Sequence, residues 1–203
     1  DINNDNLTSI GVFASLTHGN FDATVSTPNF MYNQLVEKKN GTWQYTPLKY
    51  WPNNDSDKIS FFAYAPHNAT GVTPSNAIQK GYPSFTYTTP TAEADQVDLL
   101  AATPIINQNG GSVDFKMQHA LTKVVFNVKS NDDITGKVIT AFSITGAKSG
   151  TLAFHVPAND DDKGFGWTYP STVTAETFTA TTKSLSVPDK SLSLIHISEP
   201  TRH

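Results

Sequence analysis

The segment Ile59-Ser60-Phe61-Phe62-Ala63-Tyr64-Ala65 constrains the fold more than any other part of the sequence. A polar turn precedes it and Pro66 follows it, so it is expected to form one short strand. Successive side chains of a strand point to opposite faces, and a strand with one wet face alternates apolar and polar residues. Here Phe61 lies on one face and Phe62 on the other, so something must cover the second face as well as the first.

Short runs of β-forming residues, separated by clusters of turn residues, recur along the chain. No helical period is sustained for three turns, and the abundance of Thr, Ser, Asn and aromatic residues favours strands and turns. This pattern predicts an all-β fold of the sandwich type. Besides 59–65, the expected strands are 9–14, 41–45, 84–88, 138–144, 151–156 and one within 177–187, while 97–101 fits either a strand or a short helical turn.

Gly110-Gly111 marks the expected boundary between two units. Beyond it, Val113, Phe115 and Met117 place apolar side chains at odd positions, whereas Val124 and the following apolar residues fall at even positions. Because side chains alternate with a period of two, one unbroken strand cannot bury both sets on one face. We therefore predict a bulge, a bend or a change of sheet between residues 119 and 122.

The composition argues against several classes of function. Charged residues make up 16% of the chain and the formal net charge is −4, so no basic field is available to hold nucleic acid. No apolar run approaches the length that spans a bilayer. The chain has no cysteine, which excludes disulfides, zinc thiolates and cysteine nucleophiles.

Few residues are candidates for catalysis or metal binding, and for each of them a purely structural role is the better explanation. His155 falls on the polar side of its strand, and His119 lies at the predicted bend, where a structural hydrogen bond is expected. The turn Asp160-Asp161-Asp162 lacks the ligand spacing and the closing glutamate of a calcium loop. A hydrolase would need paired carboxylates facing one cleft, and the acidic residues lie mainly in turns. We expect no enzyme activity, no cofactor and no metal.

Three blocks of sequence carry a resemblance to a known family. They are GTWQYTPLKYWPNNDSDKISFFAYAPH (41–67), QVDLLAA (96–102) and VDFKMQHALTKVVFNV (113–128). In this order they resemble the fimbrillin-like proteins of the Bacteroidales, the Mfa-like and FimA-like fimbrial subunits. The signature residues are Trp43, Tyr45, Tyr50, Trp51, Pro52, Phe61, Phe62, Tyr64, Pro66, Asp98, His119, Ala120, Leu121, Lys123 and Phe126.

The resemblance implies two transthyretin-like β-sandwich domains in tandem. Residues 1–111 would form the N-terminal sandwich, and residues 112–190 would form part of a second, incomplete one. The last residues, SLSLIHISEPTRH (191–203), match nothing in the family and look like a translated sequencing adapter, so we expect them to be a non-native tail. An incomplete sandwich leaves a strand edge open for pairing.

The resemblance also implies a function without chemistry. The protein would be a fimbrial subunit, a tip protein or an anchor protein that joins other subunits by strand donation and mediates adhesion. It would be exported as a lipoprotein to the outer membrane and the cell surface, with a signal segment that is absent from this chain.

A carbohydrate-binding surface module of a polysaccharide-uptake system is the alternative. It requires Trp43, Trp51 and Tyr64 to be exposed on one flat face, where they could stack on host or bacterial glycans.

Overall fold

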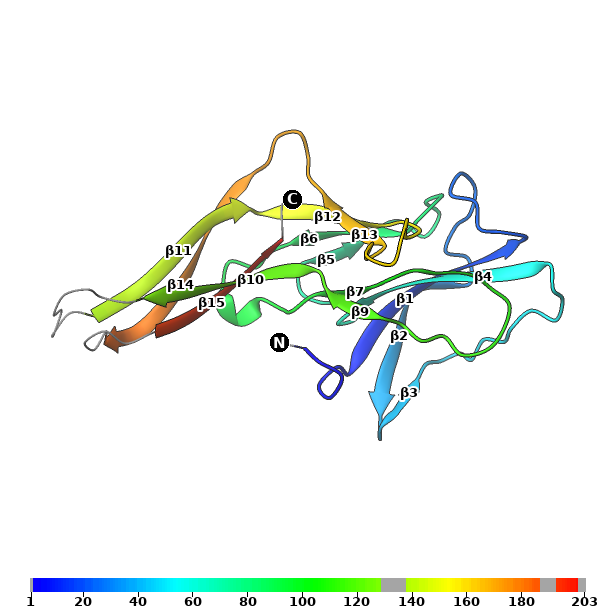
Figure 1. Cartoon of the computed structure of the whole chain (residues 1–203), viewed down its shortest axis with the longest axis horizontal. Helices are drawn as coiled ribbons and strands as arrows, with labels where there is room; N and C mark the ends of the chain where they lie inside the picture. The colour runs from blue at the N-terminus through cyan, green and yellow to red at the C-terminus, as the bar shows by residue number, and fades with distance from the viewer. Residues whose placement is uncertain (1, 129–137, 187–192, 201–203) are drawn as a thin grey trace.

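The computed structural model describes residues 2–128, 138–186 and 193–200, and it confirms the all-β class (Figure 1). One 3-10 turn, η1 (Glu93–Asp95), interrupts the strands. Within the described ranges, no helix is long and apolar enough to cross a membrane. The strands are β1 (Ser9–His18), β2 (Met31–Lys39), β3 (Thr42–Gln44), β4 (Asp57–Ala65), β5 (Val72–Pro74), β6 (Ser84–Thr88), β7 (Leu100–Ala102), β8 (Ile105–Gln108), β9 (Met117–His119), β10 (Leu121–Val128), β11 (Val138–Ala147), β12 (Ser149–Phe154), β13 (Phe165–Thr168), β14 (Ala175–Ser186) and β15 (Ser193–Pro200).

Two antiparallel sheets pack face to face. Sheet A has the order β3-β2-β1-β4-β7-β9, with β8 also paired to β4, and sheet B has the order β13-β12-β6-β5. The core between them, called here the inter-sheet core, is rich in aromatic rings. Tyr64 of sheet A meets Phe85 of sheet B at a ring separation of 5.1 Å, and Phe62 meets Phe154 at 5.7 Å. Such rings bury a large apolar area and dominate the stability of a chain without disulfides.

Strand β4 is buried on both faces, as its sequence predicts. Phe62 and Tyr64 point into the inter-sheet core, and both are fully buried. Phe61, which is 6% exposed, points to the opposite side of sheet A, where Ile59 and Ala63 join it in a second cluster. This second-face core is covered by segments outside the strands, among them residues 51 and 113–115, rather than by another sheet.

The predicted change of sheet between residues 119 and 122 is confirmed. Strand β9 ends at His119 and pairs with β7 in sheet A, whereas β10 begins at Leu121 and pairs with β15 in a separate sheet. Ala120 lies between them and donates its N–H to the carbonyl of Leu99 at 2.8 Å. The shift of the apolar side chains from odd to even positions therefore marks the point where the chain leaves sheet A.

Strands β12 and β13 come from the expected second domain but complete sheet B of the first sandwich, because β12 pairs with β6. The pairs β10–β15 and β11–β14 extend from one end of this sandwich, at the left of Figure 1. Phe178, Ala180 and the partly buried Phe126 and Phe142 form a small core there. The division into domains at residues 111/112 stays a proposal. Under that division, two strands of the second domain, β12 and β13, lie in the first sandwich.

Strand β15 lies within 191–203, the segment expected to be non-native, and it pairs along β10. That expectation concerns the origin of the segment rather than its conformation, and it stays a prediction.

Candidate functional site

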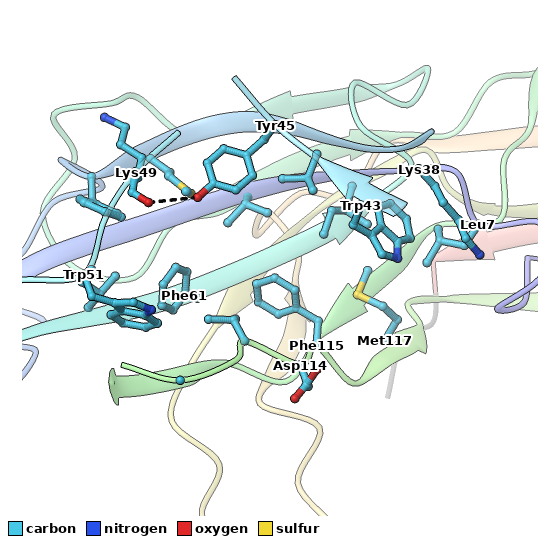
Figure 2. A pocket seen from close by; sticks show the side chains of 18 of the residues that line it. Leu7, Lys38, Trp43, Tyr45, Lys49, Trp51, Phe61, Asp114, Phe115 and Met117 are labelled. Carbon is cyan, nitrogen blue, oxygen red and sulfur yellow. Dashed lines mark hydrogen bonds between the residues drawn. The ribbon is translucent and has the colours of Figure 1, made fainter. Parts of the chain in front are cut away.

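An apolar groove of about 640 Å³ lies on the second face of sheet A. Its floor is made by β1, β2 and β4, which contribute Val12, Val36 and Phe61. Three segments far apart in sequence wall it: residues 4–7, residues 43–51 and residues 111–117. Figure 2 shows Tyr45 and Trp43 on one side of the floor, with Phe115 and Met117 on the other.

The first wall, residues 43–51, starts at β3, where Trp43 pairs with Lys38 of β2. The hydroxyl of Tyr45 donates to the carbonyl of Lys49 at 3.4 Å, which closes the wall on itself (Figure 2). Trp51 packs edge-on against Phe61 with ring centroids 5.8 Å apart. The wall is thus attached to the sheet at both ends.

Several apolar side chains of this wall reach into solvent. Trp43 is 41% exposed, Leu48 is 64% exposed and Tyr50 is 80% exposed. Trp43 and Tyr50 also line the groove, so part of the aromatic lining is open to an incoming molecule.

The second wall is the segment 111–117, which ends at Met117, the first residue of β9. Its odd residues Val113, Phe115 and Met117 line the groove and are half-buried, whereas Ser112 and Lys116 are exposed. Phe115 contacts Phe61 edge-on at 6.4 Å. The odd-numbered apolar residues identified in the sequence therefore face this groove. Strand β9 is the last strand in the order of sheet A, so among the described residues its outer edge has no paired strand.

The polar groups around the groove are few. Lys38, Lys49 and Asp114 contribute charged side chains, and the Lys49 ammonium lies 5.5 Å from the centre of the Phe30 ring. Across the described ranges, no group of three or more His, Cys, Asp or Glu residues could hold a metal ion. The arrangement suits the binding of apolar side chains.

The signature residues separate into five groups. Trp43, Tyr45, Tyr50, Trp51 and Phe61 line the groove. Phe62, Tyr64, Ala120 and Leu121 lie in the inter-sheet core. Pro52 and Pro66 follow Trp51 and the end of β4. Lys123 and Phe126 lie on β10, where Phe126 stacks on Phe142 at 5.2 Å.

The remaining two signature residues form a pair, because the His119 Nδ1–H donates to the carboxylate of Asp98 at 2.8 Å.

The glycan platform that the alternative function requires is not present as one face. Tyr64 is fully buried, and its hydroxyl donates to the side chain of Asn33 at 2.7 Å. Trp51 is half-buried against Phe61. The three rings therefore do not form the flat, exposed surface that stacking on a sugar requires.

His155 directly follows β12, which ends at Phe154 rather than at residue 156 as expected, and it makes a structural contact. Its ring nitrogen Nε2 is 2.8 Å from Asp162, in the turn that leads to β13. The pKa of Asp162 is lowered from 3.8 to about 2, first by the backbone N–H of Gly164, then by that of Ala158 and by His155. The Asp160-Asp161-Asp162 turn is thus closed by its own hydrogen bonds.

Sequence reasoning did not find the groove itself. The N-terminal residues Asn4 and Leu7 belong to its lining, and no motif indicated them. The available signal was the apolar character of both faces of β4. It predicted that a layer covers the second face, but it did not identify the residues of that layer.

Comparisons with known proteins agree with this structure. The fimbrillin-like family model matches residues 2–200. The fimbrium subunit Fim1C of Phocaeicola vulgatus is 35% identical over 156 residues, which cover 68% of this chain and 41% of that protein. The chain thus spans less than half the length of this curated relative.

Among solved structures, a fimbrial protein from Bacteroides vulgatus aligns with a TM-score of 0.61 and 22% identity, covering 94% of this chain and 83% of that one. This likeness shows that the fold is shared. The family match over nearly the whole chain and the identity to Fim1C show that this chain belongs to the fimbrillin-like family.

Proposed function

We propose that this protein is a fimbrial subunit and that it joins a neighbouring subunit by taking an extended segment of it into the groove on sheet A. The observation that carries the proposal is the groove of about 640 Å³, bounded on one side by a segment in which half-buried apolar residues alternate with exposed ones. The fimbrillin-like family and the relative Fim1C support the fimbrial part of the proposal.

An extended segment fits the shape and the chemistry of the groove. Alternate side chains of a strand share one face, so a segment with apolar residues at every second position could bury that face on Val12, Val36 and Phe61. Its backbone could pair with the free edge at β9 and with the run before it. Each large apolar side chain that becomes fully buried contributes about 1.5–3 kcal/mol, part of which offsets the entropy lost on association.

In this proposal the protein is displayed in a fimbrium at the cell surface, after export as an outer-membrane lipoprotein, and it catalyses no reaction. Its partners are other fimbrial subunits. Adhesion to host or bacterial surfaces would then be a property of the assembled fimbrium. The support for this part is membership of the family, together with a groove lined by apolar and aromatic side chains.

Binding to tiled peptides tests the proposal. Ten-residue peptides that cover Fim1C and this chain in overlapping steps serve as donor candidates, and the purified 203-residue protein is the acceptor. We expect binding to peptides with alternating apolar residues. Val113→Asp should weaken that binding at least about tenfold, because a buried unpaired carboxylate costs more than about 1.4 kcal/mol.

Ile78→Asp is the matched control, since Ile78 is 80% exposed and lies outside the groove lining. Binding that Val113→Asp leaves unchanged, or equal loss in both variants, would contradict a strand-accepting role for the groove.

A further inference from the structure

We propose that Asp98 is a positioning residue that clamps the N-terminal segment, residues 2–7, in place as the end wall of the groove. This inference rests on the proposed function, because it assigns the clamp a role in holding the bound strand. It gives two signature residues, Asp98 and His119, a physical task that the sequence pattern did not specify.

The two carboxylate oxygens of Asp98 hold two different parts of the chain. Oδ2 accepts the backbone N–H of Ile2 at 2.6 Å, and Oδ1 accepts the Nδ1–H of His119 at 2.8 Å. Hydrogen bonds to a carboxylate are shorter and roughly twice as strong as bonds between neutral groups. The Asp98 side chain is 21% exposed, so water competes only in part for these bonds.

The base of the clamp is fixed to sheet A. Asp98 precedes Leu99, which is fully buried and accepts the N–H of Ala120 at 2.8 Å. His119 is paired with Leu100 between β9 and β7. Because strand pairing holds both ends of this contact, the Asp98 carboxylate has little freedom to follow a moving N-terminal segment. The segment is therefore held where the sheet places it.

The clamped segment forms part of the groove. Asn4 and Leu7 line it, and Leu7 is 8% exposed. Lys38 of β2 attaches the other end of the segment, because its backbone N–H donates to the carbonyl of Thr8 at 2.8 Å. Its ammonium also reaches the carbonyl of Asn4 at 3.5 Å. Without Asp98, Ile2 would lose the acceptor of its backbone N–H, and the start of the segment would be held mainly by the packing of the Ile2 side chain on the second-face core.

The end wall should matter for how long a strand stays bound. A wall that swings out would let water reach the apolar lining at that end, and a bound side chain there would lose its contact with Leu7. The penalty should appear mainly in the dissociation rate, since mutations at one interface usually change dissociation more than association. We expect dissociation to become about five- to tenfold faster when the clamp is removed.

The test compares Asp98→Ala with Asp57→Ala in the full chain. Asp57 is the matched control, because it makes the same kind of pair, with His18 at 2.9 Å, but binds no part of the N-terminal segment. Hydrogen exchange of the amides of residues 2–7 reports on the segment. The dissociation rate of the tightest tiled peptide reports on the groove.

We expect Asp98→Ala to speed both exchange and dissociation at least about fivefold, and Asp57→Ala to leave both within about twofold. Asp98→Asn keeps an oxygen acceptor for the Ile2 N–H, so its exchange should stay within about threefold of the unaltered chain.

Each outcome decides a different point. Unchanged exchange at residues 2–7 in Asp98→Ala, or exchange in Asp98→Asn as fast as in Asp98→Ala, would overturn the clamp. Faster exchange with an unchanged dissociation rate would overturn its role in the groove. If no tiled peptide binds the unaltered chain, the proposed function fails, and hydrogen exchange alone then decides whether Asp98 clamps the segment.

Discussion

Replacing Phe61 and Phe62 one at a time by alanine tests whether sheet A carries a packed layer on each face. The two residues are neighbours on β4 and point to opposite sides. The Phe62 ring is fully buried and lies 5.7 Å from the rings of Phe21 and Phe154. Phe61 is 6% exposed and packs against Trp51 on the groove side. Because both residues belong to the same strand, a difference in the stability of the two variants reports on the packing of the two layers.

The expected cost follows from the buried area and from the space left behind. A buried aromatic side chain removes roughly 150–250 Å² from water, at about 25 cal/mol per Å². Phe→Ala substitutions in cores accordingly cost about 3–5 kcal/mol. Phe62 is enclosed on all sides, so Phe62→Ala should cost about 4 kcal/mol or more. Phe61 borders the groove, where water can enter the new space, so Phe61→Ala should cost about 3 kcal/mol.

Urea unfolding followed by tryptophan fluorescence measures both values, provided that the slope m stays constant between variants. Tyr50→Ala is the reference for an exposed ring, because Tyr50 is 80% exposed, and it should change stability by less than about 0.5 kcal/mol. A cost for Phe61→Ala below about 1 kcal/mol, together with a large cost for Phe62→Ala, would refute the reasoning. It would mean that the second face of sheet A is no packed layer, and the groove would lose its floor.

Three further predictions concern other parts of the fold. The pKa of Asp162 is lowered from 3.8 to about 2, so the contribution of Asp162 to stability is present above about pH 4 and is lost as the pH falls through 2. Melting temperatures measured over this pH range should show the loss, and Asp162→Asn should lack it. The Trp167 Nε1–H donates to the carbonyl of Ala120 at 2.7 Å, so Trp167→Phe should lower the free energy of unfolding by about 1–3 kcal/mol in urea titrations. Gly71 has φ +89°, and a Cβ there would overlap the backbone carbonyl of Thr88, so Gly71→Ala should lower the melting temperature by at least about 5 °C in calorimetry.

The sequence predicted local features of the fold well where one strand carries its own signal. The aromatics on both faces of 59–65 predicted a strand covered twice, and the shift in apolar positions near Ala120 predicted the change of sheet. Strand β2, Met31–Lys39, was missed. Asn33 has φ +43°, and the register between β1 and β2 shifts between Val12 and Ala14. The alternation of inward and outward side chains is therefore interrupted within β2, which removes the pattern that indicates a strand.

Pairings between distant segments could not be predicted in the same way. Strands β12 and β13 complete sheet B through β6, more than sixty residues earlier in the chain. Nothing in the alternation of residues 149–154 distinguishes a partner in the first sandwich from one in the second. The groove had the same difficulty, because its walls come from residues 4–7, 43–51 and 111–117. The sequence singled out the aromatic residues of 43–51 and the alternating apolar residues of 113–117, but nothing in it indicated that these segments and residues 4–7 meet.

The two faces of sheet A differ in a way that explains why binding is assigned to one of them. The inter-sheet face is closed by sheet B, and its rings meet partners such as Phe85 and Phe154 from that sheet. Among the described residues, the other face is covered mostly by segments outside the strands, with an apolar groove between them. An extended segment would complete that layer.

A bound segment would also stabilise the acceptor, because a ligand that binds only the folded state raises its stability by mass action. Assembly and stability are therefore coupled in this proposal. The tiled peptide that binds tightest should raise the melting temperature of the unaltered chain in proportion to the logarithm of its concentration. It should do so much less for Val113→Asp, whose groove carries an unpaired carboxylate.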